Sequence, residues 1–383
     1  MAVHIHTSLE ELPAEAWDRL GGDRDPFVSH AFLAALERHG CLDPFGWYPR
    51  HVTVHDASGA LRGAVPFYLK DNSYGEFVFD WEWAEAYQRA GLDYYPKGVV
   101  GVPYTPATGP RLLLADRDDD ATAQQLIEAV HALADELDLS SVHWNFLEKD
   151  DSLRLEAAGL LQRTGWQYHW EHRGETDFEA LLMGFTRDKR KKIRQERRRA
   201  AASGLHFETV HGDAASASDW TAFHALYLHL FERKWGMPTL SREFFAEIGA
   251  RLGRRVVLQL ARDASGSIVA AALLLRGEHT LYGRHWGCRE TVDGLHFELC
   301  YYRGLEYCLE HGLRRFEPGA QGEYKIARGF LPTLTRSAHR ITDARFRQAL
   351  DGHLARERRA VQHQVEMLAE HTPYRTQSRQ TTP

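Results

Sequence analysis

The sequence of 383 residues has no run of about 18 apolar residues, so no segment of it predicts a transmembrane helix. Its first 17 residues, MAVHIHTSLEELPAEAW, also lack the basic and apolar segments of a secretory signal. We therefore expect a cytoplasmic protein without a membrane span.

Cysteine is scarce as well. The four cysteines, Cys41, Cys288, Cys300 and Cys308, form no CxxC pair. Because the expected compartment is reducing, we predict buried, reduced thiols rather than a disulfide framework.

Several common catalytic motifs are missing from the sequence. It contains no HExxH, no Walker GxxxxGK, no GxGxxG opening a helix and no GxSxG elbow. None of the 22 histidines pairs at convincing ligand spacing with a third group nearby, so no metal site is predicted. We also expect no tightly bound cofactor.

The composition is that of a globular protein. Apolar residues make up 43% and aromatic residues 11%, which is enough for a sizeable core. The length suits two domains or one duplicated domain. The net charge of −6 does not indicate a nucleic-acid binder, so any such binding would need a local basic patch.

A weak internal repeat organises the chain. Residues 50–70 and 255–276 each contain two β-rich runs around the tetrapeptide Asp-Ala-Ser-Gly, which is typical of a hairpin. Each hairpin is followed by an expected helix and strand, at 121–137 and 140–146 in the first half and at 295–311 and 313–318 in the second. Strands alternating with helices predict an α/β (α+β) fold with at least one parallel pairing in each of two tandem copies.

The segments around these repeats are less regular. Residues 71–110 form an excursion rich in aromatics, Gly and Pro, and its length without clean periodicity is typical of packing or of a ligand site. We expect further helices at 186–201, 222–231, 242–253 and 343–370, followed by a disordered tail at 372–383.

The helix at 186–201 is strongly basic. Residues 187–199 contain nine basic and two acidic side chains. One interpretation is a solvated face with pairs such as Lys192 with Glu196. The other is a patch for tRNA or a nucleotide-linked substrate. Its candidate phosphate- or RNA-binding residues are Lys189, Arg190, Lys192 and Arg194.

Two segments of the second half carry candidate site residues. In the expected strand 281–288, LYGRHWGC, alternation predicts Tyr282, Arg284 and Trp286 on one face and Gly283, His285 and Gly287 on the other. Glycines in a strand are typical of close approach by a ligand or another backbone. An adjacent arginine could bind a carboxylate or phosphate, or it could simply lie at the surface beside a bulge.

The segment 316–330, FEPGAQGEYKIARGF, follows the last strand of the second half, where ligands bind in open α/β sheets. Glu317, Glu323 and His296 are candidate general bases, and Lys325 is a further candidate catalytic residue. Candidate substrate-binding residues are Tyr282, Arg284, Trp286, Gln321 and Arg328, with Lys325 and Arg328 suited to hold an oxyanion or a phosphate. The alternative is that Glu323 and Arg328 pair in a surface turn.

With these residues in view, the chain resembles the FemAB-like branch of the GNAT superfamily, a group of predicted N-acyltransferases and peptidoglycan-biosynthesis-like proteins. The resemblance runs from about residue 5 to about residue 365. It rests on SSVHWNF, RTGWQYHW, RDKRKKIRQERR, LYGRHWGC, LHFELCYY and FEPGAQGEYKIARGFLP. It implies two tandem GNAT-like domains, each a mixed central sheet flanked by helices. The expected boundaries are 1–170, a linker with a basic helical insertion at 171–253, a second domain at 254–342 and a C-terminal helix at 343–371.

The resemblance also implies amide-forming acyl transfer, with aminoacyl-tRNA as the donor in Fem transferases. The pyrophosphate-binding turn of acetyltransferases, [RQ]xxGx[GA], is not present, because residues 288–295 read CRETVDGL. That departure favours an aminoacyl donor over acyl-CoA. We expect direct attack of an amine without a covalent enzyme intermediate. The alternatives are an acyl-CoA-dependent acetyltransferase and a non-catalytic binding protein. The oligomeric state is not indicated.

Overall fold

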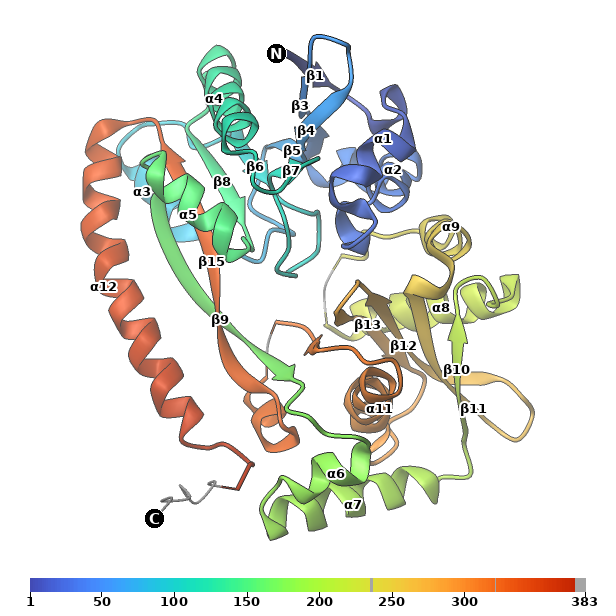
Figure 1. Ribbon diagram of the computed structural model, residues 1–383. Coiled ribbons are helices and arrows are strands. Elements are labelled where there is room, and N and C mark those ends of the chain that lie inside the picture. Colours follow the sequence, from blue (N-terminus) through green and yellow to red (C-terminus); the bar gives the residue numbers. More distant parts are fainter. Residues whose placement is uncertain (235–236, 321, 376–383) are drawn as a thin grey trace. The chain divides into compact units, whose positions relative to one another are not determined.

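A computed structural model describes residues 1–234, 237–320 and 322–375, and the chain forms two compact units (Figure 1). Unit 1 comprises residues 1–165, 237–255 and 334–362, and unit 2 comprises residues 166–236, 256–333 and 363–383. The units therefore interleave along the chain, whereas the sequence suggests consecutive domains. One cause is the helix expected at 242–253, whose Phe244 ring packs 5.4 Å from that of Phe32 in unit 1.

Unit 1 contains a four-stranded antiparallel sheet in the order β1-β3-β4-β7 and a second, mixed sheet in the order β2-β5-β6-β8 with part of β15. Its strands are β1 (Ala2–His6), β2 (Trp47–Pro49), β3 (His51–His55), β4 (Leu61–Val65), β5 (Phe67–Lys70), β6 (Lys97–Val100), β7 (Leu113–Leu114) and β8 (Ser141–Asn145). Its helices are α1 (Ala14–Trp17), α2 (His30–Arg38), α3 (Trp81–Arg89), α4 (Asp120–Glu136), α5 (Lys149–Ala157) and α9 (Arg242–Leu252). The apolar face of α4 packs on this unit's core.

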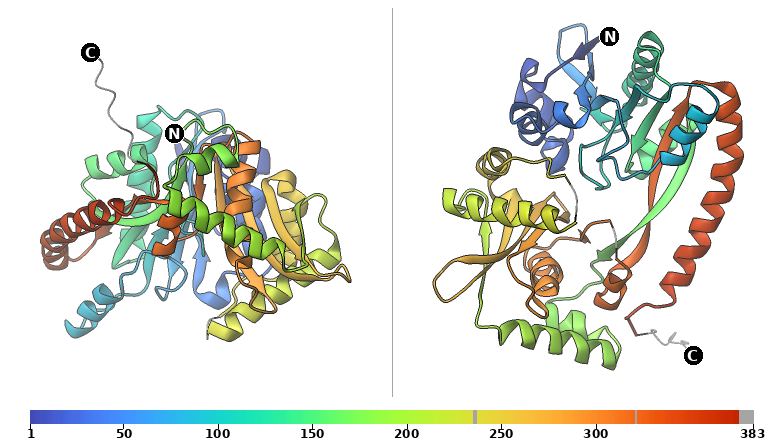
Figure 2. Two further views of the ribbon diagram at one scale, coloured as in Figure 1. Left: turned by 90° about the horizontal axis from the view of Figure 1, so that it is seen from below. Right: turned by 180° about the vertical axis from the view of Figure 1, so that it is seen from behind.

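Unit 2 contains one mixed sheet in the order β10-β11-β12-β13-β14-β9, in which β13 and β14 are parallel. Its strands are β10 (His206–His211), β11 (Val256–Arg262), β12 (Ile268–Arg276), β13 (Thr280–Cys288) and β14 (Arg315–Glu317). Its helices are α6 (Phe178–Met183), α7 (Arg187–Ala201), α8 (Ala217–Lys234), α10 (Leu295–Phe297) and α11 (Arg303–Glu310). Helix α8 lies along β12 and β13 and α11 along β13 and β14, and the two are on opposite faces of the sheet (Figure 2).

Three elements begin in one unit and end in the other: β9 (Leu161–Glu171), β15 (Leu331–Ile341) and α12 (Ala344–Ala369). Within the described ranges, no helix combines the length and the hydropathy needed to cross a bilayer.

Both predicted hairpins are confirmed, and their turns have the same local geometry. Asp56 Oδ1 accepts hydrogen bonds from the backbone N–H groups of Ser58 (2.9 Å) and Ala60 (3.0 Å). Asp263 Oδ1 accepts the equivalent bonds from Ser265 (2.9 Å) and Ser267 (3.1 Å). The glycine that ends each tetrapeptide has a φ of +83°, a conformation that glycine adopts without steric cost. The repeated tetrapeptide therefore specifies the same turn twice.

Several local expectations differ from the structure. The aromatic excursion contains α3 and β6, and its Tyr74, Phe79 and Trp81 are exposed. Cys288 and Cys300 are only partly buried, whereas Cys41 and Cys308 are buried as predicted.

The segment expected as a disordered tail begins with an ordered turn. Tyr374 is buried, and its hydroxyl donates a hydrogen bond to the Gly329 carbonyl (3.0 Å). Residues 376–383 of that segment lie outside the described residues.

Candidate functional site

Strand β13 carries a β-bulge at Arg284. In its pairing with β12, His285 opposes Leu273 and Gly283 opposes Leu274, which leaves Arg284 as the extra residue. A bulge interrupts the alternation of side chains and redirects them. The bulge shifts the alternation by one residue, so the prediction that Tyr282 and Trp286 share one face was wrong. His285 and Trp286 still point apart as predicted, because the His285 ring lies 5.2 Å from that of Tyr227 on α8, whereas the Trp286 ring lies beside that of His296. All four residues from Gly283 to Trp286 contribute to the wall of one cavity.

That cavity has a volume of about 80 Å³ and opens where the parallel strands β13 and β14 stop pairing. The last paired residues are Tyr282 and Glu317, and a Cβ atom at Gly283 would lie 3.2 Å from Pro318 Cα. This close approach is the reason for glycine at 283. The lining residues are Ala272, Leu273, Leu274, Gly283, Arg284, His285, Trp286, His296, Cys300, Tyr301 and Pro318.

Three residues predicted for the site meet in this cavity: Arg284, Trp286 and His296. The ring of His296 lies between that of Trp286, at 5.1 Å, and that of Tyr301, at 5.3 Å. His296 belongs to the short helix α10, which continues into a π-helical turn, Glu298–Tyr302, that brings Cys300 and Tyr301 to the cavity. The sequence interpretation missed these last two as site residues because it treats 295–311 as a regular helix.

The cavity carries positive charge on one residue. Burial lowers the pKa of Arg284 to about 10, opposed by Tyr227 and Glu317, so the guanidinium remains charged at neutral pH. Burial, followed by the charge of Arg284, lowers the pKa of His285 to about 3, so that imidazole is neutral. Burial also raises the pKa of Cys300, which keeps its thiol protonated. The chemistry available is thus a fixed cation beside neutral polar groups.

Glu317 ends β14 and is buried, with 3% of its surface exposed. Its Oε1 lies 3.8 Å from His169 Nδ1 and 3.8 Å from a nitrogen of Arg315. Burial lowers the pKa of His169 to about 3, with Arg315 and Lys325 acting in the same direction. Glu317 therefore belongs to a buried polar cluster with His169 and Arg315 and is not one of the residues that line the cavity.

Lys325 lies on a 3₁₀ helix, Glu323–Arg328, and is 2% exposed. Its ammonium group donates a hydrogen bond of 2.7 Å to the Gly319 carbonyl. Burial lowers the pKa of Lys325 to about 8, opposed by Cys300. This lysine thus ties down the loop after Pro318, and it can release its proton close to neutral pH. Glu323 is exposed, and Gln321 lies outside the described residues.

Arg328 is buried in a contact with the basic helix. Its guanidinium donates two hydrogen bonds, of 2.9 and 3.0 Å, to the carboxylate of Glu196 on α7, and its Cζ lies 3.4 Å from the centre of the Phe297 ring. The hydroxyl of Tyr302 donates to the same carboxylate. The pairs suggested between Arg328 and Glu323 and between Lys192 and Glu196 are therefore replaced by one buried pair.

The cations of the basic helix α7 fall into two groups: some are held by hydrogen bonds or ion pairs, and others have no such partner among the described residues. Arg190 donates a hydrogen bond of 2.8 Å to the Phe185 carbonyl, and Arg194 pairs with Glu179 at 2.5 Å. Among the described residues, the side chains of Lys189 and Lys192 have no ion-pair or hydrogen-bond partner. A groove of about 470 Å³ runs beside the helix, lined by Phe178, Glu179, Leu182, Arg194, Arg197, Arg198, Ala201, Phe207, Glu298 and Arg303.

The corresponding position in unit 1 is filled by the chain itself. Strands β6 and β8 are parallel, as β13 and β14 are in unit 2. Beyond β8, Gly109 forms a parallel bridge with Leu147, and the buried guanidinium of Arg111 donates to the carbonyls of Asn145 (2.9 Å) and Ala107 (2.8 Å). Unit 2 thus has space between its parallel strands where unit 1 has packed backbone.

Two units, each with a mixed sheet that contains one parallel pair, define a mixed α/β protein, and the predicted α/β class is confirmed. The family model that describes peptidoglycan biosynthesis and recognition proteins matches residues 8–376. The chain belongs to the FemAB-like family.

Solved structures agree with this fold. The crystal structure of FemX is similar with a TM-score of 0.55 at 13% identity, over 92% of this chain and 100% of that one. The C-terminal domain of a putative lysylphosphatidylglycerol synthetase from Agrobacterium fabrum has a TM-score of 0.55 at 12% identity, over 90% and 96%. L-PGS from Bacillus licheniformis has a TM-score of 0.50 at 13% identity, over 92% and 98%. No curated protein sequence matches the chain.

Proposed function

We propose that the chain is an N-acyltransferase that forms an amide in unit 2, with an aminoacyl-tRNA as the favoured donor and a cytoplasmic location. The observation that supports this is the cavity between the separating strands β13 and β14, with Arg284 and His296 in its wall. An ester carbonyl placed there would meet a fixed cation and a titratable imidazole.

In the proposed reaction, the nitrogen of a substrate amine attacks the carbonyl carbon of the aminoacyl ester. The C–N bond forms, negative charge develops on the carbonyl oxygen beside Arg284, and the C–O bond to the ribose then breaks. His296 takes the proton of the attacking amine and returns it to the departing ribose oxygen. Of the three candidate bases, His296 is favoured because it lines the cavity, whereas Glu323 is exposed and Glu317 is buried outside the cavity lining.

No covalent enzyme intermediate is needed in this scheme. Cys300 lies in the cavity with His296, but burial raises the pKa of its thiol, and a protonated thiol is a poor nucleophile. Lys325 positions the loop after Pro318 through Gly319. Burial lowers the pKa of this lysine to about 8, so it can also exchange a proton near neutrality.

The packing around the N-terminus of α10 favours an aminoacyl donor over acyl-CoA. A pyrophosphate group needs exposed N–H groups at a helix N-terminus. Here a Cβ atom at Gly294, the residue before α10, would lie 2.8 Å from the Glu196 carbonyl oxygen, so α7 packs against that turn. The free Lys189 and Lys192 of α7 are cations that could neutralise tRNA phosphates.

The donor is tested by titrating the full chain with charged tRNA, uncharged tRNA and acetyl-CoA in a calorimeter. We expect the charged tRNA to bind more tightly than the uncharged form, and Arg284→Met to remove that difference. Glu323→Gln is the matched control, because it alters an exposed charge of the same segment. Sub-millimolar binding of acetyl-CoA without tRNA binding would support the acetyltransferase alternative. Binding of none of the three would support a non-catalytic protein.

The chemistry is tested by amide formation in single turnover with the bound donor and a pool of small amines. Lys325→Ala and His296→Ala should each abolish the reaction while the circular dichroism spectrum is unchanged. Wild-type rates of amide formation in both variants would show that this cavity is not the site of the reaction.

A further inference from the structure

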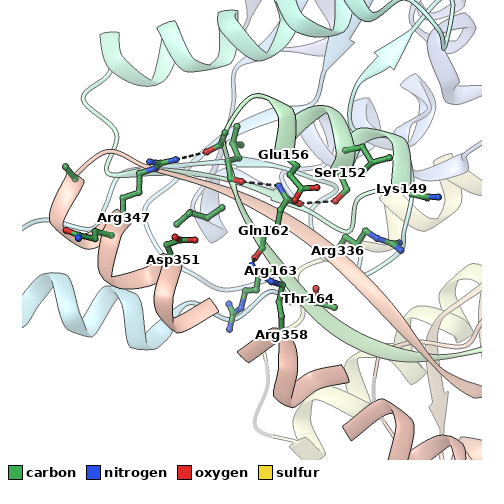
Figure 3. Close-up of a pocket in the computed structure, with 16 residues that line it drawn as sticks. Lys149, Ser152, Glu156, Gln162, Arg163, Thr164, Arg336, Arg347, Asp351 and Arg358 are labelled. Atoms are coloured by element: carbon green, nitrogen blue, oxygen red, sulfur yellow. Dashed lines mark hydrogen bonds between the residues drawn. The ribbon is translucent and has the colours of Figure 1, made fainter. Parts of the chain in front are cut away.

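Unit 1 contains a cavity of about 680 Å³ that shares no residue with the cavity of unit 2. Its walls come from α5, the start of β9, β15 and the part of α12 from Ala344 to Arg358 (Figure 3). The lining residues are Lys149, Ser152, Leu153, Glu156, Gly159, Leu160, Leu161, Gln162, Arg163, Thr164, Arg336, Ala344, Arg347, Gln348, Asp351 and Arg358. This volume is in the range of small-molecule sites.

The charge of the lining is unbalanced. It contains five cations and two carboxylates, Glu156 and Asp351. Arg163 is neutralised by Glu357, at 2.8 Å, and stacks on Trp83, so it is part of the packing. The remaining four cations have no carboxylate partner among the described residues.

Two of those four cations are held in place by backbone carbonyls. Arg347 donates a hydrogen bond of 2.7 Å to the Gly159 carbonyl, and Arg358 donates to the Gln162 carbonyl. Both arginines extend from α12 toward β9: Arg347 toward the turn before this strand and Arg358 toward its first residues (Figure 3). Each guanidinium has five donors, so one such bond orients the group and leaves the other donors for a ligand.

The other two cations have no internal role. The side chains of Lys149 on α5 and Arg336 on β15 make no hydrogen bond or ion pair with the described residues. Cations that lie close together in a concave site repel one another, and a bound anion would relieve this repulsion.

We propose that this cavity binds a small phosphorylated polyol, such as a sugar phosphate. Arg336, Lys149 and the oriented arginines of α12 suit a phosphate group, which arginine binds through paired donors. Glu156, Asp351 and Gln348 supply acceptors for hydroxyl groups. The described lining contains no aromatic residue on which a nucleobase could stack, so a nucleotide is not the expected ligand.

The competing explanation is that the arginines only fasten α12 to β9. The two explanations differ in what they predict for Arg336, because its side chain makes no hydrogen bond or ion pair with the described residues. Arg336→Met should therefore leave the melting temperature unchanged and still weaken ligand binding. Arg359→Met is the matched control, since it removes an exposed cation of α12 that does not line the cavity.

The test is calorimetric titration of the full chain with glucose 6-phosphate, glycerol 3-phosphate, fructose 6-phosphate, inorganic phosphate and glucose. We expect at least one phosphorylated polyol to bind at least tenfold more tightly than inorganic phosphate, with no binding of glucose. Arg336→Met should weaken it about tenfold or more, the loss of one charge-assisted contact, and Arg359→Met less than twofold. The proposal is overturned if no phosphorylated polyol binds at millimolar concentration, if inorganic phosphate binds as tightly, or if Arg336→Met binds like the wild type.

Discussion

Lowering the pH from 7.5 to 5.5 should destabilise unit 1, because two histidines are buried there in contact with each other. His143 on β8 and His339 on β15 are directly opposed in the antiparallel pairing, with their Nδ1 atoms 2.7 Å apart. They are 2% and 1% exposed. A contact between two ring nitrogens holds a single proton, so the two rings cannot both carry one at Nδ1.

The surroundings of the pair also disfavour protonation. Burial lowers the pKa of His143 well below its ordinary value, and the charges of Lys97 and Arg163 act in the same direction. For His339, burial is again the largest cause, followed by His143 and Arg163. The nearby carboxylate of Asp80 opposes this shift.

The change in the free energy of unfolding with pH follows from the difference in proton binding between the folded and unfolded chain. The unfolded chain takes up a proton on each histidine below a pH of about 6.5, whereas the folded chain does not, so the free energy of unfolding falls as the pH falls below that value. Each such histidine contributes a slope of about 1.4 kcal/mol per pH unit in this range. Between pH 7.5 and 5.5 the two together should remove about 3 kcal/mol. Above pH 6.5 their contribution is constant.

The measurement is urea unfolding at pH 7.5 and 5.5 for the wild type and for the double variant His143→Gln and His339→Gln. The variant will differ in absolute stability, so the informative quantity is the loss between the two pH values, which should be smaller than in the wild type by about 3 kcal/mol. His353→Gln, an exposed histidine on α12, is the control and should match the wild type. An identical pH loss in the double variant and the wild type would refute the reasoning.

Three further predictions concern packing and buried charge. Gly287→Ala should cost about 1–3 kcal/mol, because the new Cβ would lie 2.5 Å from the Leu226 carbonyl oxygen on α8; an unchanged melting temperature would contradict this. Glu196→Ala should cost about 3–5 kcal/mol by leaving Arg328 buried without its carboxylate, and adding Arg328→Met should restore part of the stability seen in urea unfolding. Lys97→Met leaves two buried carboxylates and should cost about 3–5 kcal/mol at pH 7.5, but less at pH 6 in the same assay. The reason is that burial raises the pKa of one of them, Glu76, to about 7.

Local patterns in the sequence were sufficient for much of the fold. The two Asp-Ala-Ser-Gly turns, the amphipathic helix α4 and the basic helix α7 were predicted close to their observed bounds. Their geometry depends on hydrogen bonds and apolar spacing within about 20 residues, and such interactions can be inferred from a single segment. The mixed α/β class followed from the order of these segments, and the family resemblance followed from short motifs such as LYGRHWGC and FEPGAQGEYKIARGFLP.

The arrangement of the candidate site depended on contacts that no local pattern contains. The bulge at Arg284 is a property of the register between β12 and β13, and it put Tyr282 and Trp286 on opposite faces, against the expected alternation. Arg328 found its partner, Glu196, 132 positions away on α7 rather than in its own turn. The units interleave because α9 packs on α2 of the first half. Pairing register and burial are set by the whole chain at once, so only the tertiary structure decided which of the predicted residues meet.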